Sequence, residues 1–302
     1  MKISVLVFNF GSIGVRHSKI LRNVFKLKNI NIFTKRKIKN FKTVDNLSKI
    51  KNLNPSYFII ASPTSKHYQH LKFIESNFKN KTVLVEKPLF DRFRELRIKR
   101  NKVFVGYNLR FSPILGYIKK KISKKKIIDI KVNCNSYLPF WRPKINYQNT
   151  SSAKKSLGGG VVLELSHELD YIRWIFGNPK IKFVETGKFS NLKINTEDLL
   201  KLYGKIGNAN LSIDINYYSR ISKRTIFIDG LGFSLFADLL KNRVEIQIDD
   251  KRFIKTFPNK KNDTYISQHK EILKGKTKKV CSYSFALETM RIIDKIKKWK
   301  KN

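Results

Sequence analysis

The chain has 302 residues and 41% of them are hydrophobic, enough for the buried core of one large or two ordinary domains. No apolar run reaches the length of a membrane span, and the N-terminal apolar run lacks a small-residue cleavage site, so we predict neither a membrane helix nor a signal peptide. The two cysteines, Cys134 and Cys281, exclude a disulfide framework and a zinc cluster, and they suit a reducing cytoplasm.

The charge balance is strongly basic, with 64 Lys and Arg against 22 Asp and Glu, a formal net charge of +42. Such a charge attracts polyanions such as nucleic acid or an anionic membrane surface. The lysines are scattered along the chain, however, and Lys, Asn, Ile, Phe and Tyr are all abundant, as AT-rich codons specify. We therefore attribute the charge mainly to codon usage and predict no specific nucleic-acid or membrane partner. A nucleic-acid-binding protein is kept as an alternative that salt-dependent DNA binding would reveal.

The first 110 residues alternate between short apolar runs and helical periodicity. Strands are predicted at 3–8, 30–33, 57–61, 82–85 and 102–106. Between the third and fourth of these, Pro63 and Thr64 open a predicted helix that runs to about Phe78, with Thr64 as its N-cap. Strands that alternate with helices predict βαβ units and a parallel sheet.

The pattern changes near Phe111. A helix to about Ile122 and a strand at 127–136 precede an irregular segment at 137–157; Gly158 to Gly160 then open an amphipathic helix that runs to Phe176. Strand-like runs fill 181–257, and helices are predicted at 264–273 and 285–299. The fold class is therefore α/β, with a parallel-sheet domain at 1–111 and an α+β domain at 112–302 that carries a large, mostly antiparallel open sheet. The C-terminal helix is expected to pack back on the first domain.

The turn after the first strand resembles the dinucleotide fingerprint G-x-G-x-x-G, with Asn9 in place of the first glycine. Asn tolerates positive φ better than other non-glycine residues, so it can form the tight turn. Gly11 would let the backbone approach a pyrophosphate, and Gly14 would let the following helix pack against the strand. We predict that the cofactor contacts this turn at Asn9, Gly11, Ser12, Ile13 and Gly14. An ordinary βα turn without a ligand is the alternative.

The end of the second strand bears on the choice of cofactor. An acidic residue about 20 positions beyond the glycines would bind the ribose 2′-hydroxyl of NAD. This chain instead has Thr34, Lys35 and Arg36, a hydroxyl and cations that suit a 2′-phosphate. We therefore predict NADP in preference to NAD, with NAD as the alternative.

Two further motifs follow predicted strands. Ala61, Ser62, Pro63, Thr64 and His67 form one; Glu86, Lys87 and Pro88 form the other. With the fingerprint, they resemble the A-[ST]-P-T-x-x-H and E-K-P motifs of the glucose–fructose oxidoreductase/inositol dehydrogenase (Gfo/Idh/MocA) family. The resemblance implies a Rossmann domain followed by an α/β domain on a large open sheet. It also implies cofactor contacts at Ala61, Ser62, Pro63, Thr64, His67, Glu86 and Lys87.

The resemblance implies catalytic roles for Lys87 and for the helix after Gly160. In the family, the lysine that matches Lys87 contacts the cofactor and the reacting hydroxyl, and a cis Lys87–Pro88 bond is an accompanying hypothesis. His167 is the candidate general acid/base, with Glu164 and Asp170 on the same side of the predicted helix. Many members carry an aspartate four residues before this histidine, where this chain has Leu163. The identity of the carboxylate that orients His167 is therefore left open.

Candidate substrate residues are Arg110, Trp141, Arg142, Tyr147 and His167. Arg110 lies in a segment that resembles the family's link to its second domain. The 141–148 loop resembles a W-R-P…D-Y-R stretch of members from surface-sugar biosynthesis, with Asn146 and Gln148 replacing the Asp and the Arg. Aromatic residues with an arginine suit a sugar carrying an anionic group, although an ordinary aromatic loop core is an equal alternative. His67 and His70 lack an evident third ligand, so we predict no metal.

These features predict a cytoplasmic NAD(P)-dependent oxidoreductase. It would act between a secondary hydroxyl and a ketone of a sugar, nucleotide sugar or cyclitol, and surface-polysaccharide biosynthesis is one setting. A non-catalytic cofactor-binding sensor or scaffold is one alternative; an enzyme of the same fold that uses the cofactor transiently for elimination or glycoside cleavage is another. The exposed face of an open sheet predicts a homo-oligomer.

Overall fold

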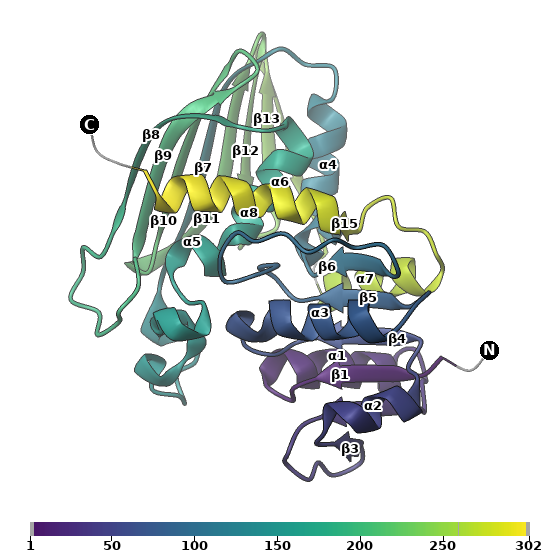
Figure 1. Ribbon diagram of the computed structural model, residues 1–302. Coiled ribbons are helices and arrows are strands. Elements are labelled where there is room, and N and C mark those ends of the chain that lie inside the picture. The colour runs from purple at the N-terminus through teal and green to yellow at the C-terminus, as the bar shows by residue number, and fades with distance from the viewer. Residues whose placement is uncertain (1–2, 259, 300–302) are drawn as a thin grey trace. The chain divides into compact units, whose positions relative to one another are not determined.

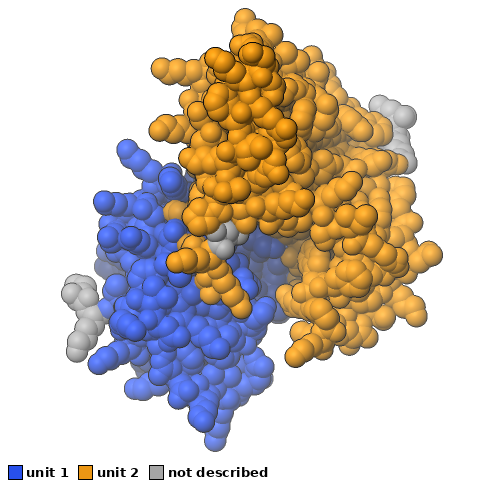
Figure 2. Space-filling view, turned by 180° about the vertical axis from the view of Figure 1, so that it is seen from behind, with its two compact units in different colours: residues 1–108, 264–291 blue, residues 109–263, 292–302 orange. Residues whose placement is uncertain are grey.

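The computed structural model describes residues 3–258 and 260–299 (Figure 1). The chain forms two compact units (Figure 2). The first contains the residues up to 108 together with 264–291, and the second contains 109–263 with the residues from 292 onward. The division predicted at Phe111 placed 264–291 in the second domain. The structure groups them with the first unit because β15 (Cys281–Ser282) pairs with β6 (Lys102–Val105).

The first unit is built on a seven-stranded sheet in the order β15-β6-β5-β4-β1-β2-β3. All pairs are parallel except β15 with β6. The central strands are buried because their residues are apolar on both faces, as a parallel sheet between helices requires. The remaining strands are β1 (Val5–Phe8), β2 (Ile30–Phe33), β3 (Lys42–Val44), β4 (Tyr57–Ile60) and β5 (Thr82–Val85).

Helices α1 (Ser12–Asn23), α2 (Leu47–Leu53) and α3 (His67–Asn77) connect these strands, and α7 (Asp263–Leu273) and α8 (Tyr283–Lys297) come from the end of the chain. The predicted N-cap at Thr64 is wrong. Thr64–Lys66 form a separate 3-10 turn, and α3 begins at His67 without a side-chain cap. The β3–α2 segment was not predicted, because Lys42–Val44 is too short to show a period.

The second unit is built on an eight-stranded sheet in the order β14-β13-β12-β11-β7-β10-β9-β8. Every pair is antiparallel except β7 with β10. The predicted mostly antiparallel sheet is therefore confirmed. Its strands are β7 (Ile127–Tyr137), β8 (Lys180–Gly187), β9 (Leu199–Ile206), β10 (Ala209–Asn216), β11 (Tyr218–Gly230), β12 (Phe233–Asp238), β13 (Arg243–Ile248) and β14 (Lys251–Thr256).

Strand alternation gives this sheet one apolar and one mixed face. Ile130, Val132, Ile226 and Ile228 are buried on the apolar face. Helix α4 (Pro113–Ile122) contacts α6 (Ser166–Phe176), and α5 (Val161–Glu164) contacts β9 and β10. The predicted single helix to Phe176 is divided at Leu165, whose φ of −97° and ψ of 20° interrupt it. None of the helices described in the two ranges is long and apolar enough to cross a membrane.

Candidate functional site

The glycine turn after β1 has the geometry expected for a pyrophosphate-binding turn. Asn9 adopts a φ of 73°, as predicted for the residue that replaces glycine. A Cβ on Gly14 would lie 2.2 Å from the carbonyl oxygen of Asn9, so the close packing of α1 requires glycine there. A Cβ on Gly11 would meet only the Asn9 side chain, at 3.5 Å. Packing within the protein therefore does not require glycine at this position. The close approach of a pyrophosphate to the protein backbone would require it.

The first turn of α1 can accept an anion. Gly11 is the N-cap and supplies no side-chain bond, and Ser12 is the first helical residue, with no acidic residue in that turn. Backbone N–H groups at such a helix end bind phosphate well. These observations fit the prediction of a dinucleotide whose phosphates would lie against Gly11 to Gly14.

Four loops that carry predicted cofactor residues begin at the same edge of the first sheet. Phe8 aligns with Phe33 and Ile60, and Ile60 aligns with Val85. The residues that follow these four strand ends, namely Asn9, Thr34, Ala61 and Glu86, therefore lie along the carboxyl edge, where open α/β sheets bind their ligands.

The end of β2 carries its cations next to the glycine turn. A guanidinium nitrogen of Arg36 donates to the carbonyl oxygen of Phe10 at 3.0 Å, and the backbone N–H of Arg36 donates to Thr34 Oγ1 at 3.3 Å. Lys35 and Arg36 are exposed. This loop thus presents positive charge beside the turn that would hold the phosphates.

His67 does not face a ligand in the way the motif implied. Its ring is buried, with Nδ1 3.0 Å from the carbonyl oxygen of Pro88 and Nε2 3.0 Å from that of Ser62. The side chain therefore ties the loop after β4 to the loop after β5. His70 Nδ1 lies 3.0 Å from Ser62 Oγ, and burial lowers the pKa of His70 to about 4.

The Glu86–Lys87–Pro88 motif forms a turn with the hypothesised cis Lys87–Pro88 bond. Glu86 is buried, and its Oε2 accepts the backbone N–H of Lys87 at 3.3 Å. A Cβ on Gly106 would lie 2.6 Å from Glu86 Oε1, so glycine at that position leaves room for the carboxylate. Lys87 is half-buried.

Two of the three glycines before α5 have packing reasons of their own. A Cβ on Gly159 would lie 2.2 Å from the carbonyl oxygen of Ser151, and one on Gly160 would lie 2.3 Å from Glu197 Oε1. Gly160 also has a φ of 111°. Because the helix is interrupted after α5, Glu164 does not share a continuous helical face with His167. It accepts a hydrogen bond from Ser152 Oγ at 2.8 Å instead.

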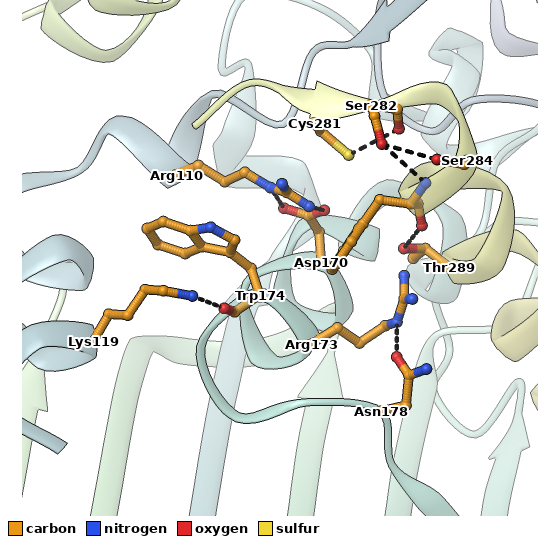
Figure 3. A network of polar contacts seen from close by, with 11 residues as sticks. Arg110, Lys119, Asp170, Arg173, Trp174, Asn178, Cys281, Ser282, Ser284 and Thr289 are labelled. Atoms are coloured by element: carbon orange, nitrogen blue, oxygen red, sulfur yellow. Dashed lines mark hydrogen bonds and ion pairs between the residues drawn. The ribbon is translucent and has the colours of Figure 1, made fainter. Parts of the chain in front are cut away.

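Arg110 and Asp170 form a buried, bidentate ion pair (Figure 3). Arg110 Nε and Nη2 donate to the two carboxylate oxygens at 2.9 and 2.7 Å, and the side chains are 4% and 1% exposed. Lys119 of α4 also donates to the carbonyl oxygen of Trp174 at the end of α6. The ion pair holds α6 to the segment that carries Arg110. The substrate role expected of Arg110 and the catalytic role expected of Asp170 stay predictions.

Glu168 is the site residue that the sequence reasoning missed. His167 Nε2 donates to Glu168 Oε1 at 3.0 Å, and the Glu168 side chain is fully buried. Arg224 of β11 and the hydroxyl of Tyr171 also bind this carboxylate. No sequence pattern indicated it, because the decisive partner, Arg224, lies on a strand 56 residues away.

The electrostatics of this cluster keep Glu168 ionised. Burial raises the pKa of Glu168, but Arg224, His167 and Tyr171 outweigh it and lower the pKa to about 2. Cys134 Sγ, His167 and Glu168 bring three potential metal-ligand atoms within 4.8 Å of one another. Arg224 already neutralises the carboxylate, however, and burial raises the pKa of the Cys134 thiol, so the cluster is better described as an ion pair than as a metal site.

The aromatic loop is partly exposed. Phe140 is 63% and Trp141 is 36% exposed, and Arg142 is exposed as well. Trp141 lies edge-on to the buried ring of Tyr217, with ring centroids 5.2 Å apart, and its Nε1 donates to Ser136 Oγ at 2.9 Å. Tyr147 is tied into the loop through its hydroxyl, which accepts the backbone N–H of Lys193 at 3.1 Å.

The first unit thus has a Rossmann fold with a glycine turn after β1, and the second unit carries a histidine bound to a buried carboxylate. Residues 19–100 match the family model of the Gfo/Idh/MocA oxidoreductases, described as an oxidoreductase family with an NAD-binding Rossmann fold. The matched residues lie within the first unit, so this match agrees with the resemblance to the Gfo/Idh/MocA family that the motifs predicted.

Among curated proteins, the chain is 29% identical over 126 residues to the uncharacterized oxidoreductase sll0816 of Synechocystis sp.. That match covers 39% of this chain and about a third (33%) of the relative's length.

Solved structures show the same fold over nearly the whole chain. An oxidoreductase of Thermotoga maritima has a TM-score of 0.81 at 14% identity, covering 99% of this chain and 96% of its own. The UDP-N-acetylglucosamine 3-dehydrogenase GnnA of Acidithiobacillus ferrooxidans has a TM-score of 0.77 at 12% identity, covering 98% and 97%. The WlbA dehydrogenase of Bordetella pertussis, solved with NADH and UDP-GlcNAcA, has a TM-score of 0.76 at 16% identity, covering 98% and 96%. These likenesses confirm the predicted two-domain fold.

Proposed function

We propose that this protein is an NADP(H)-dependent oxidoreductase of a sugar, nucleotide sugar or cyclitol, acting between a secondary hydroxyl and a ketone. The observation that carries the proposal is the carboxyl edge of the first sheet. There the Gly11 turn, the cations after β2 and the Glu86–Lys87–Pro88 turn all follow parallel strand ends. The Gfo/Idh/MocA match and the sugar-nucleotide dehydrogenases among the fold relatives support the substrate class.

The bound nicotinamide would carry the hydride, so the protein must handle the hydroxyl proton. His167 suits this role. Because its Nε2–H donates to Glu168, the Nδ1 atom of the neutral ring holds the lone pair that accepts a proton. The Lys87 ammonium would orient the reacting hydroxyl and stabilise a developing alkoxide. Glu168 would keep the His167 ring oriented, the role sought for a carboxylate four residues earlier.

The loop of Trp141, Arg142 and Tyr147 would bind the substrate. Its exposed aromatic side chains can cover a sugar face, and Arg142 can pair with a carboxylate or phosphate. UDP-linked and free sugar acids therefore lead the substrate panel.

The test is direct. Purified protein is mixed with NADPH or NADP and a panel of nucleotide sugars, sugar acids and cyclitols, and absorbance at the nicotinamide band is followed. Turnover that depends on one of these substrates supports the proposal. Cofactor binding without turnover of any of them favours the sensor or scaffold alternative. Product formation without net change of the cofactor favours elimination or glycoside cleavage.

We also propose that the protein self-associates through the outward face of the eight-stranded sheet. Phe183, Tyr203, Phe236 and Ile254 are 39–53% exposed there. Most surfaces of a +42 chain repel a second copy, but this face also carries acidic side chains beside the basic ones: Asp129, Glu185, Asp214, Asp229, Asp238 and Glu245. Sedimentation should show an oligomer that Phe236→Asp dissociates, whereas a monomeric wild type would contradict the assignment.

A further inference from the structure

Four polar side chains of the first unit form a continuous buried chain of hydrogen bonds that the proposed function does not use. Tyr57 Oη lies 3.0 Å from His269 Nδ1, His269 Nε2 lies 2.8 Å from His17 Nδ1, and His17 Nε2 lies 2.9 Å from Glu86 Oε1. The four residues come from β4, α7, α1 and the turn after β5, and none is more than 5% exposed. Each bond thus joins segments far apart in sequence.

The protons in this chain of hydrogen bonds can be placed from Tyr57 and His269. Burial raises the pKa of Tyr57 well above its usual value, so its hydroxyl keeps its proton and can donate to His269 Nδ1. Burial, and then His17, lower the pKa of His269 well below its usual value, so this ring is neutral and carries its single proton on Nε2.

That placement determines the rest of the chain. His269 Nε2–H donates to His17 Nδ1, so the neutral His17 ring must carry its proton on Nε2 and donate it to Glu86. Every ring nitrogen is then used, and the chain runs in one direction, from the tyrosine hydroxyl to the carboxylate. Both oxygens of Glu86 accept a bond, one from His17 and one from the backbone N–H of Lys87.

We propose that His17, His269 and Tyr57 are positioning residues that hold Glu86 as an oriented carboxylate, and through it the backbone of Lys87. The inference deepens the proposed function, because Lys87 is the residue assigned to the substrate hydroxyl. In a reversed chain an unprotonated Nε2 of His17 would face the Glu86 carboxylate, which can only accept, so the Nε2–H tautomers of both imidazoles follow from the arrangement. Tyr265 lies edge-on to His17, and the Arg16 guanidinium lies over the Tyr265 ring. His67 and Tyr265 are also within electrostatic reach of Glu86.

The first test reads the tautomers directly and does not depend on activity. The chain has 5 histidines, so a long-range ¹H–¹⁵N spectrum of the ¹⁵N-labelled full-length protein can be assigned by single His→Gln variants. At pH 7, His17 and His269 should both appear as neutral Nε2–H rings. An Nδ1–H tautomer or a doubly protonated ring at either position would overturn the proposal.

The second test separates positioning from mere packing. In His17→Gln the side-chain amide nitrogen can replace Nε2 and still donate to Glu86, whereas in His17→Asn it is too short to do so. We expect His17→Asn to lower kcat at least about tenfold and to shift the backbone amide resonance of Lys87, with His17→Gln close to wild type in both. Equal behaviour of the two variants would overturn the proposal. An inactive wild type would refute the proposed function alone, because the tautomers and the Lys87 amide shift would still be measured.

Discussion

Each unit of this protein buries a glutamate beside a residue that we assign to the substrate hydroxyl, but the two glutamates are stabilised by different chemistry. Glu168 of the second unit has a permanent cation, Arg224, as its partner. Glu86 of the first unit accepts hydrogen bonds from a histidine and a backbone N–H, and the next member of its chain, His269, is held neutral. An ion pair is insensitive to pH until the carboxylate itself titrates. A chain that depends on neutral imidazoles loses its contribution to stability once pH falls below the ordinary histidine pKa, because the unfolded histidines then bind protons.

The largest expected effect comes from removing the Glu168 carboxylate. Glu168→Ala leaves the Arg224 guanidinium largely buried without its partner, so we expect the free energy of unfolding to fall by about 3 kcal/mol. Urea denaturation followed by tryptophan fluorescence measures this change. Glu164→Ala is the control, since Glu164 accepts a hydrogen bond from the uncharged hydroxyl of Ser152. A similar loss in both variants would contradict the ion-pair description.

Acid should affect the two units at different pH values. Burial lowers the pKa of His67 and His269, and that of His70 to about 4 against an ordinary 6.5. Folded histidines with lowered pKa bind fewer protons than unfolded ones, so their contribution is complete above about pH 6.5 and is lost as pH falls below it. The contribution of Glu168, with a pKa of about 2 against 4.5, is about 3 kcal/mol and is lost only between pH 4.5 and 2.

The three tryptophans, Trp141, Trp174 and Trp299, all belong to the second unit and therefore report on it alone. Tryptophan fluorescence should remain native-like at pH 5, while amide exchange in the strands of the first unit should already accelerate relative to pH 7, after correction for the intrinsic rate. Simultaneous loss of both signals near pH 3 would contradict the comparison.

The next prediction tests the proposed acid/base role of His167. His167→Ala removes the proposed acid/base and should lower kcat by 10²-fold or more, which corresponds to about 2.7 kcal/mol in the barrier. Glu168→Gln should also lower kcat and shift the pH–rate profile, whereas Glu164→Gln should do neither. Retained turnover in His167→Ala would refute the assignment.

The smallest effect concerns cofactor choice in the first unit. Arg36→Ala should raise the KM for NADPH about fivefold to tenfold and leave that for NADH nearly unchanged, because an exposed guanidinium next to a phosphate contributes about 1 kcal/mol. Steady-state kinetics with both cofactors measures it, with Lys51→Ala, on α2, as the control. A wild-type KM for NADPH no lower than that for NADH would refute the NADP preference.

The sequence by itself determined the elements that depend on interactions between residues close together in the chain. The buried run Val5–Phe8 predicted a two-faced parallel strand, Asn9 predicted a positive-φ turn, and the alternation over 181–257 predicted the large sheet, all of which the structure contains. These features depend on residues that are neighbours along the chain, where period and turn chemistry can be read directly.

Only the tertiary structure decided which charged groups pair with each other. Arg110 and Asp170 resembled site residues but form a buried pair, and the carboxylate sought for His167 is Glu168, held by an arginine from a distant strand. The chain from Tyr57 to Glu86 joins four segments that carry no common pattern. A buried polar group must find a partner wherever the fold places one, so its partner is determined by packing across long sequence separations and not by spacing.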